Sequence, residues 1–154
     1  MMDPLLSVPI ESIGATLSKQ REAFLKSPPA TIHRRKANLK KLKSAIIANR
    51  ERLKVSVSED FGYRSFHETD VLEFFGITQS IDYMIKNLRK FMKREHRHVG
   101  LFFRAGKAYV DYQPKGVIGI MAPWNYPLSL TLIPLATALA AGNRAMVKPS
   151  EITP

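Results

Sequence analysis

A chain of 154 residues, 45% of them hydrophobic, is long enough to form one globular domain with a buried core. It contains no cysteine, which excludes disulfides, thiolate zinc sites and a cysteine nucleophile within these residues. The formal net charge of +11 would suit a nucleic-acid binder, but no recognised nucleic-acid motif accompanies it. We therefore interpret the charge as a solvated basic surface and expect no nucleic-acid partner.

The N-terminal part of the chain is predicted to be largely helical. Hydrophobic residues recur at helical spacing over residues 10–25, until Pro28-Pro29 breaks the pattern. A long basic amphipathic helix is expected from about residue 31 to 57, and a third helical stretch from 67 to 92. The first residues, Met1-Met-Asp-Pro-Leu-Leu, lack the positive start and apolar core of a secretory signal, which favours a cytoplasmic location.

The pattern changes near residue 99, where helical periodicity gives way to short extended segments. Two strands, residues 99–104 and 108–114, are predicted around a glycine turn at residues 105–107, and together they would form a β-hairpin. His96 and His98 lie just before this hairpin and alternate as in a strand. Because no third ligand is evident, we expect no metal site there.

Residues 116–143 carry no charged side chain. The continuously apolar segment 117–121 is typical of a strand covered on both faces in a parallel sheet. A proline-rich turn follows, then an apolar helix over residues 128–141, a left-handed stop at Gly142-Asn143 and a second strand. This order predicts one β-α-β unit. The run is also long enough for a transmembrane helix, but its internal prolines and Asn125 disfavour one, so we expect no membrane partner.

Polar residues follow both predicted strands, and each has a structural alternative to a functional role. Asn125 comes just before Pro127 and a helix, a position that also suits an N-cap. The segment Lys148-Pro-Ser-Glu151 could be an ordinary exposed turn. Trp124, taken alone, is more typical of a hydrophobic core. The residue types by themselves leave these alternatives open.

Three sequence blocks give a more specific indication when they are taken together. They are Ala122-Pro-Trp-Asn-Tyr-Pro127, Ala140-Ala-Gly-Asn143 and Lys148-Pro-Ser-Glu-Ile-Thr-Pro154. Their order and spacing resemble those of the aldehyde dehydrogenase superfamily, and each block is unusual enough that chance co-occurrence is negligible. Within the superfamily the chain is most similar to coniferyl aldehyde dehydrogenases, with fatty and other aromatic aldehyde dehydrogenases as close alternatives.

This resemblance implies specific roles for residues in the first and last blocks. Asn125 corresponds to the asparagine whose side-chain amide donates to the oxyanion formed during aldehyde oxidation. Lys148 and Glu151 correspond to residues that bind the adenosine ribose of a nicotinamide cofactor. A carboxylate at that place accepts hydrogen bonds from a diol and repels a ribose phosphate, so NAD is expected rather than NADP. The predicted cofactor-binding residues are Met121, Ala122, Pro123, Trp124, Lys148, Ser150 and Glu151.

The resemblance also implies an α/β fold that is incomplete in this chain. Residues 1–98 would form the N-terminal helical part of the cofactor-binding domain, 99–114 an oligomerisation hairpin, and 115–154 the start of a Rossmann-like NAD-binding core. The catalytic domain would be absent. The hairpin favours a homo-oligomer, a dimer or a tetramer.

The implied activity is NAD-dependent oxidation of an aldehyde, with coniferyl aldehyde as one candidate, to a carboxylic acid through a cysteine thioester. The catalytic cysteine and the general-base glutamate of the family would lie beyond residue 154, so we expect the 154 residues alone to be inactive and to form part of a longer subunit. The alternative is a truncated, non-catalytic binding or assembly module of the same fold.

Overall fold

The computed structural model of the chain describes residues 10–154. Residues 1–9 lie outside the described residues. The prediction that the chain has no secretory signal rests on residues in this segment. Six helical elements come first in the described residues: α1 (Ile10–Leu25), α2 (Ile32–Ala48), α3 (Arg50–Asp60), α4 (Phe66–Thr69), the π-helix η2 (Asp70–Phe75) and α5 (Gly76–Phe91). The 3-10 helix η3 (Leu101–Phe103) lies within the hairpin. The strands and the last helix are β1 (Glu95–Arg97), β2 (Ala108–Val110), β3 (Val117–Met121), α6 (Pro127–Ala140) and β4 (Arg144–Lys148).

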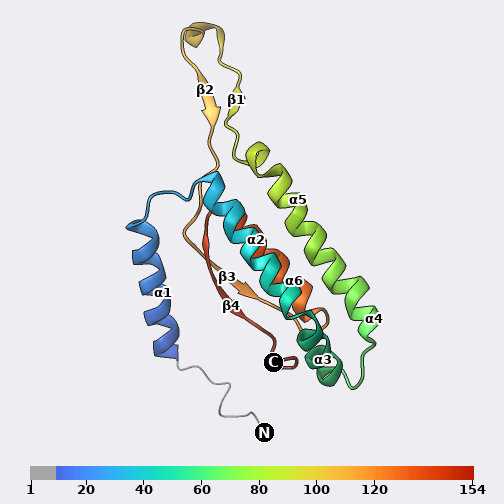
Figure 1. Cartoon of the computed structure of the whole chain (residues 1–154). Helices are drawn as coiled ribbons and strands as arrows, with labels where there is room; N and C mark the ends of the chain where they lie inside the picture. The colour runs from blue at the N-terminus through green and yellow to red at the C-terminus, as the bar shows by residue number, and fades with distance from the viewer. Residues whose placement is uncertain (1–9) are drawn as a thin grey trace.

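The helices and strands form layers around α6. Helices α2 and α5 pack against each other and against α6, and α6 in turn packs on the two-stranded parallel sheet of β3 and β4. Helix α1 stands apart from the other helices and contacts both strands of this sheet (Figure 1). The β1–β2 hairpin projects away from the layers (Figure 1). The predicted mixed α/β class, with helices before a β-α-β unit, is confirmed.

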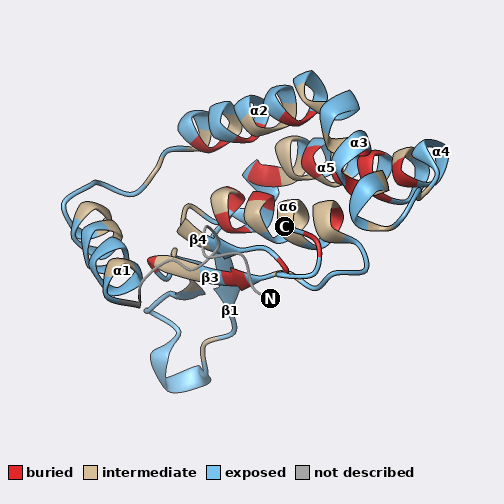
Figure 2. Ribbon diagram, turned by 90° about the horizontal axis from the view of Figure 1, so that it is seen from below, coloured by how far each residue is buried: buried red, intermediate tan, exposed pale blue. Residues whose placement is uncertain are grey.

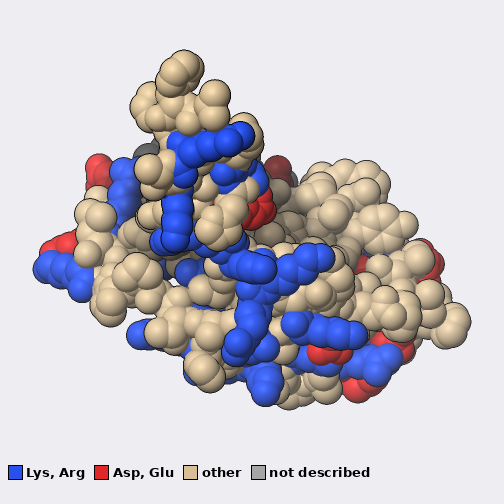
Figure 3. All heavy atoms as spheres, turned by 90° about the horizontal axis from the view of Figure 1, so that it is seen from above, with Lys and Arg blue, Asp and Glu red and all other residues tan. Residues whose placement is uncertain are grey.

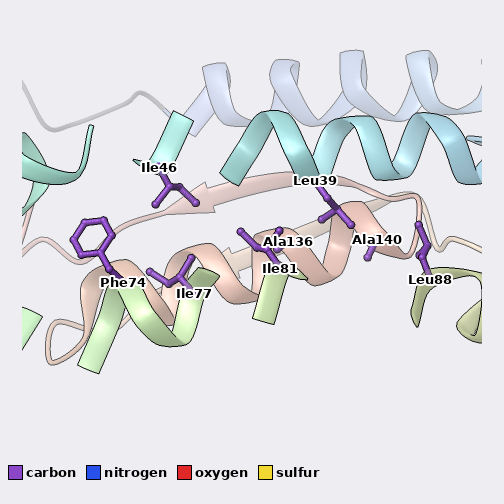
Figure 4. Close-up of a cluster of buried hydrophobic side chains, with 8 residues drawn as sticks. All are labelled: Leu39, Ile46, Phe74, Ile77, Ile81, Leu88, Ala136 and Ala140. Carbon is purple, nitrogen blue, oxygen red and sulfur yellow. The ribbon is translucent and has the colours of Figure 1, made fainter. Parts of the chain in front are cut away.

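The hydrophobic core lies where α2, α5 and α6 meet. Buried positions line the facing sides of these helices, whereas their outer sides are exposed (Figure 2). Leu39 of α2 and Ile81 of α5 are fully buried and meet Ala136 of α6, a residue small enough for the helices to approach closely (Figure 4). Lys and Arg side chains gather on the outer surface, as expected for a solvated basic face (Figure 3).

Two of the three predicted N-terminal helices differ from the expectation. Residues 10–25 are confirmed as one helix, but the long basic helix is divided at Asn49 into α2 and α3. The Asn49 side chain donates to the carbonyl of Ala45 at 2.8 Å, and asparagine competes in this way with regular helical bonding. The third stretch is helical throughout, although Asp70–Phe75 forms a π-helix that periodicity did not reveal.

The hairpin exists, but its first strand is not where the sequence predicted it. The strand is Glu95–Arg97, paired antiparallel with Ala108–Val110, and the apolar residues Leu101–Phe103 form a helical turn at the tip. The prediction relied on hydrophobicity, yet Phe102 is 95% exposed and packs on no core. Instead, Arg94 stacks 3.7 Å from the Tyr109 ring centroid and helps to hold the two strands together.

The predicted β-α-β unit is confirmed. Strands β3 and β4 are parallel, with Val117 opposite Arg144 and Met121 opposite Lys148. The expectation that β3 is covered on both faces is wrong for the described residues, since Met121 is 83% exposed. Helix α6 accounts for half of the uncharged run, and no helix within residues 10–154 has the length and apolarity needed to cross a membrane.

Helix α6 ends at the predicted left-handed stop. Gly142 has φ of +86°, the Gly142 N–H donates to the Leu139 carbonyl at 3.0 Å, and the Asn143 N–H donates to the Ala138 carbonyl at 2.9 Å. These two bonds form a Schellman motif. The Asn143 side chain also accepts from the Gly116 N–H at 2.9 Å, which ties the end of the helix to the start of β3.

Replacing Gly142 by alanine should destabilise the protein. A Cβ at this position would lie 2.6 Å from Cζ of Arg35, whose buried guanidinium donates to the Ala140 carbonyl. The left-handed backbone alone costs a non-glycine residue roughly 1–2 kcal/mol, and displacing Arg35 would add to that cost. Denaturant unfolding measures the loss. Gly14→Ala is the control, because Gly14 lies within α1 with open space around it and should gain stability; equal stability of both variants would contradict the assigned role of Gly142.

Candidate functional site

The carboxyl ends of β3 and β4 bring the first and last sequence blocks together. Met121 and Lys148 are paired across the parallel sheet, and the Ala122 N–H donates to the Lys148 carbonyl at 3.0 Å. The turn that carries Asn125 follows one strand, and the segment that carries Glu151 follows the other. Ligands of open α/β sheets bind at this edge, outside the carboxyl ends of the strands.

Asn125 lies in the turn between β3 and α6, with its side chain exposed. The N-cap of α6 is Tyr126, and Pro127 occupies the first helical turn. The N-cap alternative for Asn125 is therefore wrong. Within the described part of the chain, the Asn125 side-chain amide makes no hydrogen bond, whereas its backbone carbonyl accepts from Arg64 at 3.2 Å. The amide is thus free to donate to a bound molecule.

A carboxylate from a distant helix replaces the missing cap of α6. Oε2 of Glu73 accepts from the N–H groups of Leu128 and Ser129 at 2.8 and 3.0 Å. Glu73 is fully buried, and burial raises the pKa of its carboxyl group, while the two N–H donors and the charge of Arg64 oppose that rise. No local sequence pattern indicates the role of Glu73, because the contact joins residues 55 positions apart.

Lys148 and Glu151 form an ion pair at the end of β4. The Lys148 ammonium lies 2.5 Å from Oε2 of Glu151, and both side chains are about two-thirds exposed. The hydrogen bond from Lys148 lowers the pKa of Glu151, so its carboxylate is ionised at neutral pH and can accept hydrogen bonds. Between the two, Ser150 is buried, and its hydroxyl oxygen accepts from the Ile152 N–H at 3.1 Å. Ser150 therefore shapes the turn that presents the ion pair.

The remaining residues predicted to line a cofactor cleft lie on the open side of the turn. Trp124 is 51% exposed, which does not fit the core alternative, and its ring centroid lies 6.3 Å from that of Phe61. Ala122 is partly buried and Pro123 is exposed. Met121 also borders an open groove between β3 and α6, whose lining includes Ile133 but not Asn125.

Comparison with known proteins identifies the group to which this arrangement belongs. The model of the aldehyde dehydrogenase family matches residues 10–154. A curated relative from Pseudomonas aeruginosa, named a probable coniferyl aldehyde dehydrogenase, is 41% identical over 145 residues, which cover 94% of this chain and 30% of the relative. The chain thus spans about a third of the length of the curated relatives that it matches.

Solved structures agree with the family match. A substrate-bound aldehyde dehydrogenase from Staphylococcus aureus superposes with a TM-score of 0.87 at 31% identity, covering 92% of this chain and 31% of that one. A Mycobacterium tuberculosis aldehyde dehydrogenase in complex with NAD+ gives a TM-score of 0.81 at 26% identity, with coverage of 96% and 30%. Because the first and last sequence blocks also meet at the carboxyl edge of the sheet, we conclude that this chain belongs to the aldehyde dehydrogenase family.

Proposed function

We propose that the protein is an NAD-dependent aldehyde dehydrogenase that oxidises an aldehyde to a carboxylic acid through a cysteine thioester. The observation that carries this proposal is the exposed amide of Asn125, which lies at the same sheet edge as the Lys148–Glu151 ion pair. The Asn125 amide would bind the reacting carbonyl oxygen, and the Lys148–Glu151 ion pair would bind the cofactor. The order of these motifs along the chain supports the same assignment.

Asn125 would act on the oxyanion that forms when a thiolate adds to the aldehyde carbon. Its Nδ2–H donor stabilises the negative oxygen, which then returns its electrons to carbon as hydride leaves and a thioester forms. Water hydrolyses the thioester to the carboxylic acid and restores the thiol. The 154 residues contain no cysteine, so the proposal requires a nucleophile, and with it a general base, from outside them.

The residues at the end of β4 fit a nicotinamide cofactor. The ionised carboxylate of Glu151 suits the two hydroxyls of a ribose, and the Lys148 ammonium can donate to the same diol. When bound, the cofactor would supply the hydride acceptor. Because Glu151 would repel a ribose phosphate, we propose NAD rather than NADP as the cofactor. The M. tuberculosis enzyme named above, which is in complex with NAD+, supports a nicotinamide cofactor.

The proposed activity is tested on the natural polypeptide. Its intact mass and peptide map would first establish whether a cysteine-bearing segment accompanies these residues. Formation of NADH is then measured with coniferyl aldehyde and with a simple aliphatic aldehyde, each with NAD and with NADP. Turnover with NAD is the expected result, and preference for coniferyl aldehyde would support the substrate suggested by the named relative. Absence of turnover with every pair would overturn the proposal.

Glu151→Gln should weaken NAD binding in the natural polypeptide. Hydrogen bonds to a charged group are stronger than those to a neutral one, so KM for NAD should rise about ten- to a hundredfold with a smaller effect on kcat. The preference for NAD over NADP should also narrow, because the repulsive carboxylate is gone. Glu11→Gln, at an exposed position of α1, is the matched control. An unchanged KM for NAD would remove Glu151 from the cofactor site.

The exposed hairpin tip favours one alternative function. The 154 residues could act as a non-catalytic binding or assembly module, in which the β1–β2 hairpin contacts other subunits. This alternative predicts association without turnover, which the same assay distinguishes. A homo-oligomer and a cytoplasmic location stay predictions under either function.

A further inference from the structure

Two residues outside the three sequence blocks hold the turn that carries Asn125. Arg64 lies in the loop between α3 and α4, and Glu73 lies in the π-helix η2. Neither belongs to the residues predicted to touch substrate or cofactor. Both are withdrawn from solvent, with the Arg64 side chain 6% exposed and the Glu73 side chain fully buried.

Arg64 reaches the turn because the backbone before it folds back sharply. Gly62 and Tyr63 have φ values of +62° and +77°, and Tyr63 is the only non-glycine residue among residues 10–154 with positive φ. The Tyr63 side chain is 94% exposed, so its own burial does not explain this conformation. A non-glycine residue in the left-handed region costs roughly 1–2 kcal/mol, and the contacts of the next residue offset that strain.

The guanidinium of Arg64 contacts two aromatic rings, a backbone carbonyl and a carboxylate. Its Cζ lies 4.9 Å from the centroid of the Phe61 ring and 5.0 Å from that of Tyr126. One terminal nitrogen donates to the Asn125 carbonyl at 3.2 Å and lies 3.5 Å from Oε1 of Glu73. Within the described residues, this is the one hydrogen bond that residues 123–125 make.

Glu73 holds the other side of the same turn. Its Oε2 accepts from the N–H groups of Leu128 and Ser129, immediately after Pro127, while its Oε1 faces Arg64. The π-helix leaves the consecutive residues Glu73 and Phe74 both buried, and single turns of this kind recur at functional sites. Arg64 therefore bonds to the chain before Pro127, at Asn125, and Glu73 bonds to it after Pro127.

We propose that Arg64 and Glu73 are positioning residues that fix the backbone at Asn125, so that its amide points at the reacting oxygen. This inference rests on the proposed function. Bulk water would otherwise compete for the Asn125 carbonyl, and the turn would sample other orientations. A displacement of about 1 Å at a catalytic group can cost a hundredfold in rate, so loss of Arg64 should lower kcat about ten- to a hundredfold.

The test uses Arg64→Gln, Arg64→Lys and Glu73→Gln in the natural polypeptide. Arg64→Gln removes the charge, whereas Arg64→Lys keeps it but loses the planar fork that stacks between two rings. Glu73→Gln keeps an oxygen for the Leu128 and Ser129 N–H groups. We expect kcat to fall in all three, least in Arg64→Lys, with KM for the aldehyde and the Kd for NAD changed less than threefold. Arg34→Gln, an exposed arginine of α2, is the control.

A double-mutant cycle separates positioning from general stability. If Arg64 acts through Asn125, Arg64→Gln should cost little in an Asn125→Ala background, because the amide that it orients is already gone. Losses that multiply, or an unchanged kcat in Arg64→Gln, would overturn the inference. An inactive unsubstituted enzyme would instead overturn the proposed function, so the two failures are distinguishable.

Discussion

Asn125→Ala in the natural polypeptide is expected to lower kcat for aldehyde oxidation about a hundred- to a thousandfold, the usual cost of losing one oxyanion donor. The side chain is exposed and makes no hydrogen bond within residues 10–154, so its removal leaves no buried group unpaired. The Kd for NAD and the unfolding midpoint should therefore change little. Steady-state kinetics together with NAD titration measure these separate effects.

Two further variants sharpen this test. Asn125→Asp preserves the shape but replaces the donor by an acceptor, so it should be at least as slow as Asn125→Ala. Asn38→Ala removes an exposed asparagine from α2 and should leave turnover unchanged. Turnover of Asn125→Ala within threefold of the unsubstituted enzyme would remove Asn125 from the reaction.

The largest expected effect on stability is that of Leu39→Ala. Leu39 is fully buried between α2, α5 and α6, and its neighbours include Ile81 and Ala136. Deleting three carbon atoms there leaves a cavity that the surrounding helices fill only partly. A loss of about 2–5 kcal/mol in the free energy of unfolding is expected, measured by denaturant unfolding or by hydrogen exchange of the α2 amides.

The matched control is Leu25→Ala at the end of α1, where the leucine side chain is 81% exposed. The same substitution at this position should change the free energy of unfolding by no more than about 0.5 kcal/mol. Similar losses for the two variants would mean that the three-helix contact is not the stabilising core. Because Leu39 lies away from the sheet edge, the folded fraction of Leu39→Ala should keep its kcat.

Several local structures could be predicted because their causes lie within a few residues. Apolar spacing and the following Pro28-Pro29 predicted α1, and the continuous apolar run predicted β3. The Gly142-Asn143 stop was predictable since only glycine enters the left-handed region without cost. The three short blocks were enough to indicate the family. The meeting of the first and last blocks at one sheet edge follows from the rule that neighbouring parallel strands end at the same edge.

Contacts between distant segments decided the remaining features. The break at Asn49 and the π-helix at Asp70–Phe75 depend on packing that periodicity does not report. The apolar tip of the hairpin looked like a strand because hydrophobicity does not tell whether a covering surface exists. The sequence by itself therefore determined the β-α-β unit and the position of Asn125. Only the tertiary structure decided that Arg64 and Glu73, from a loop and a helix far back in the chain, hold that residue, because burial and charge pairing between them arise after the chain has folded.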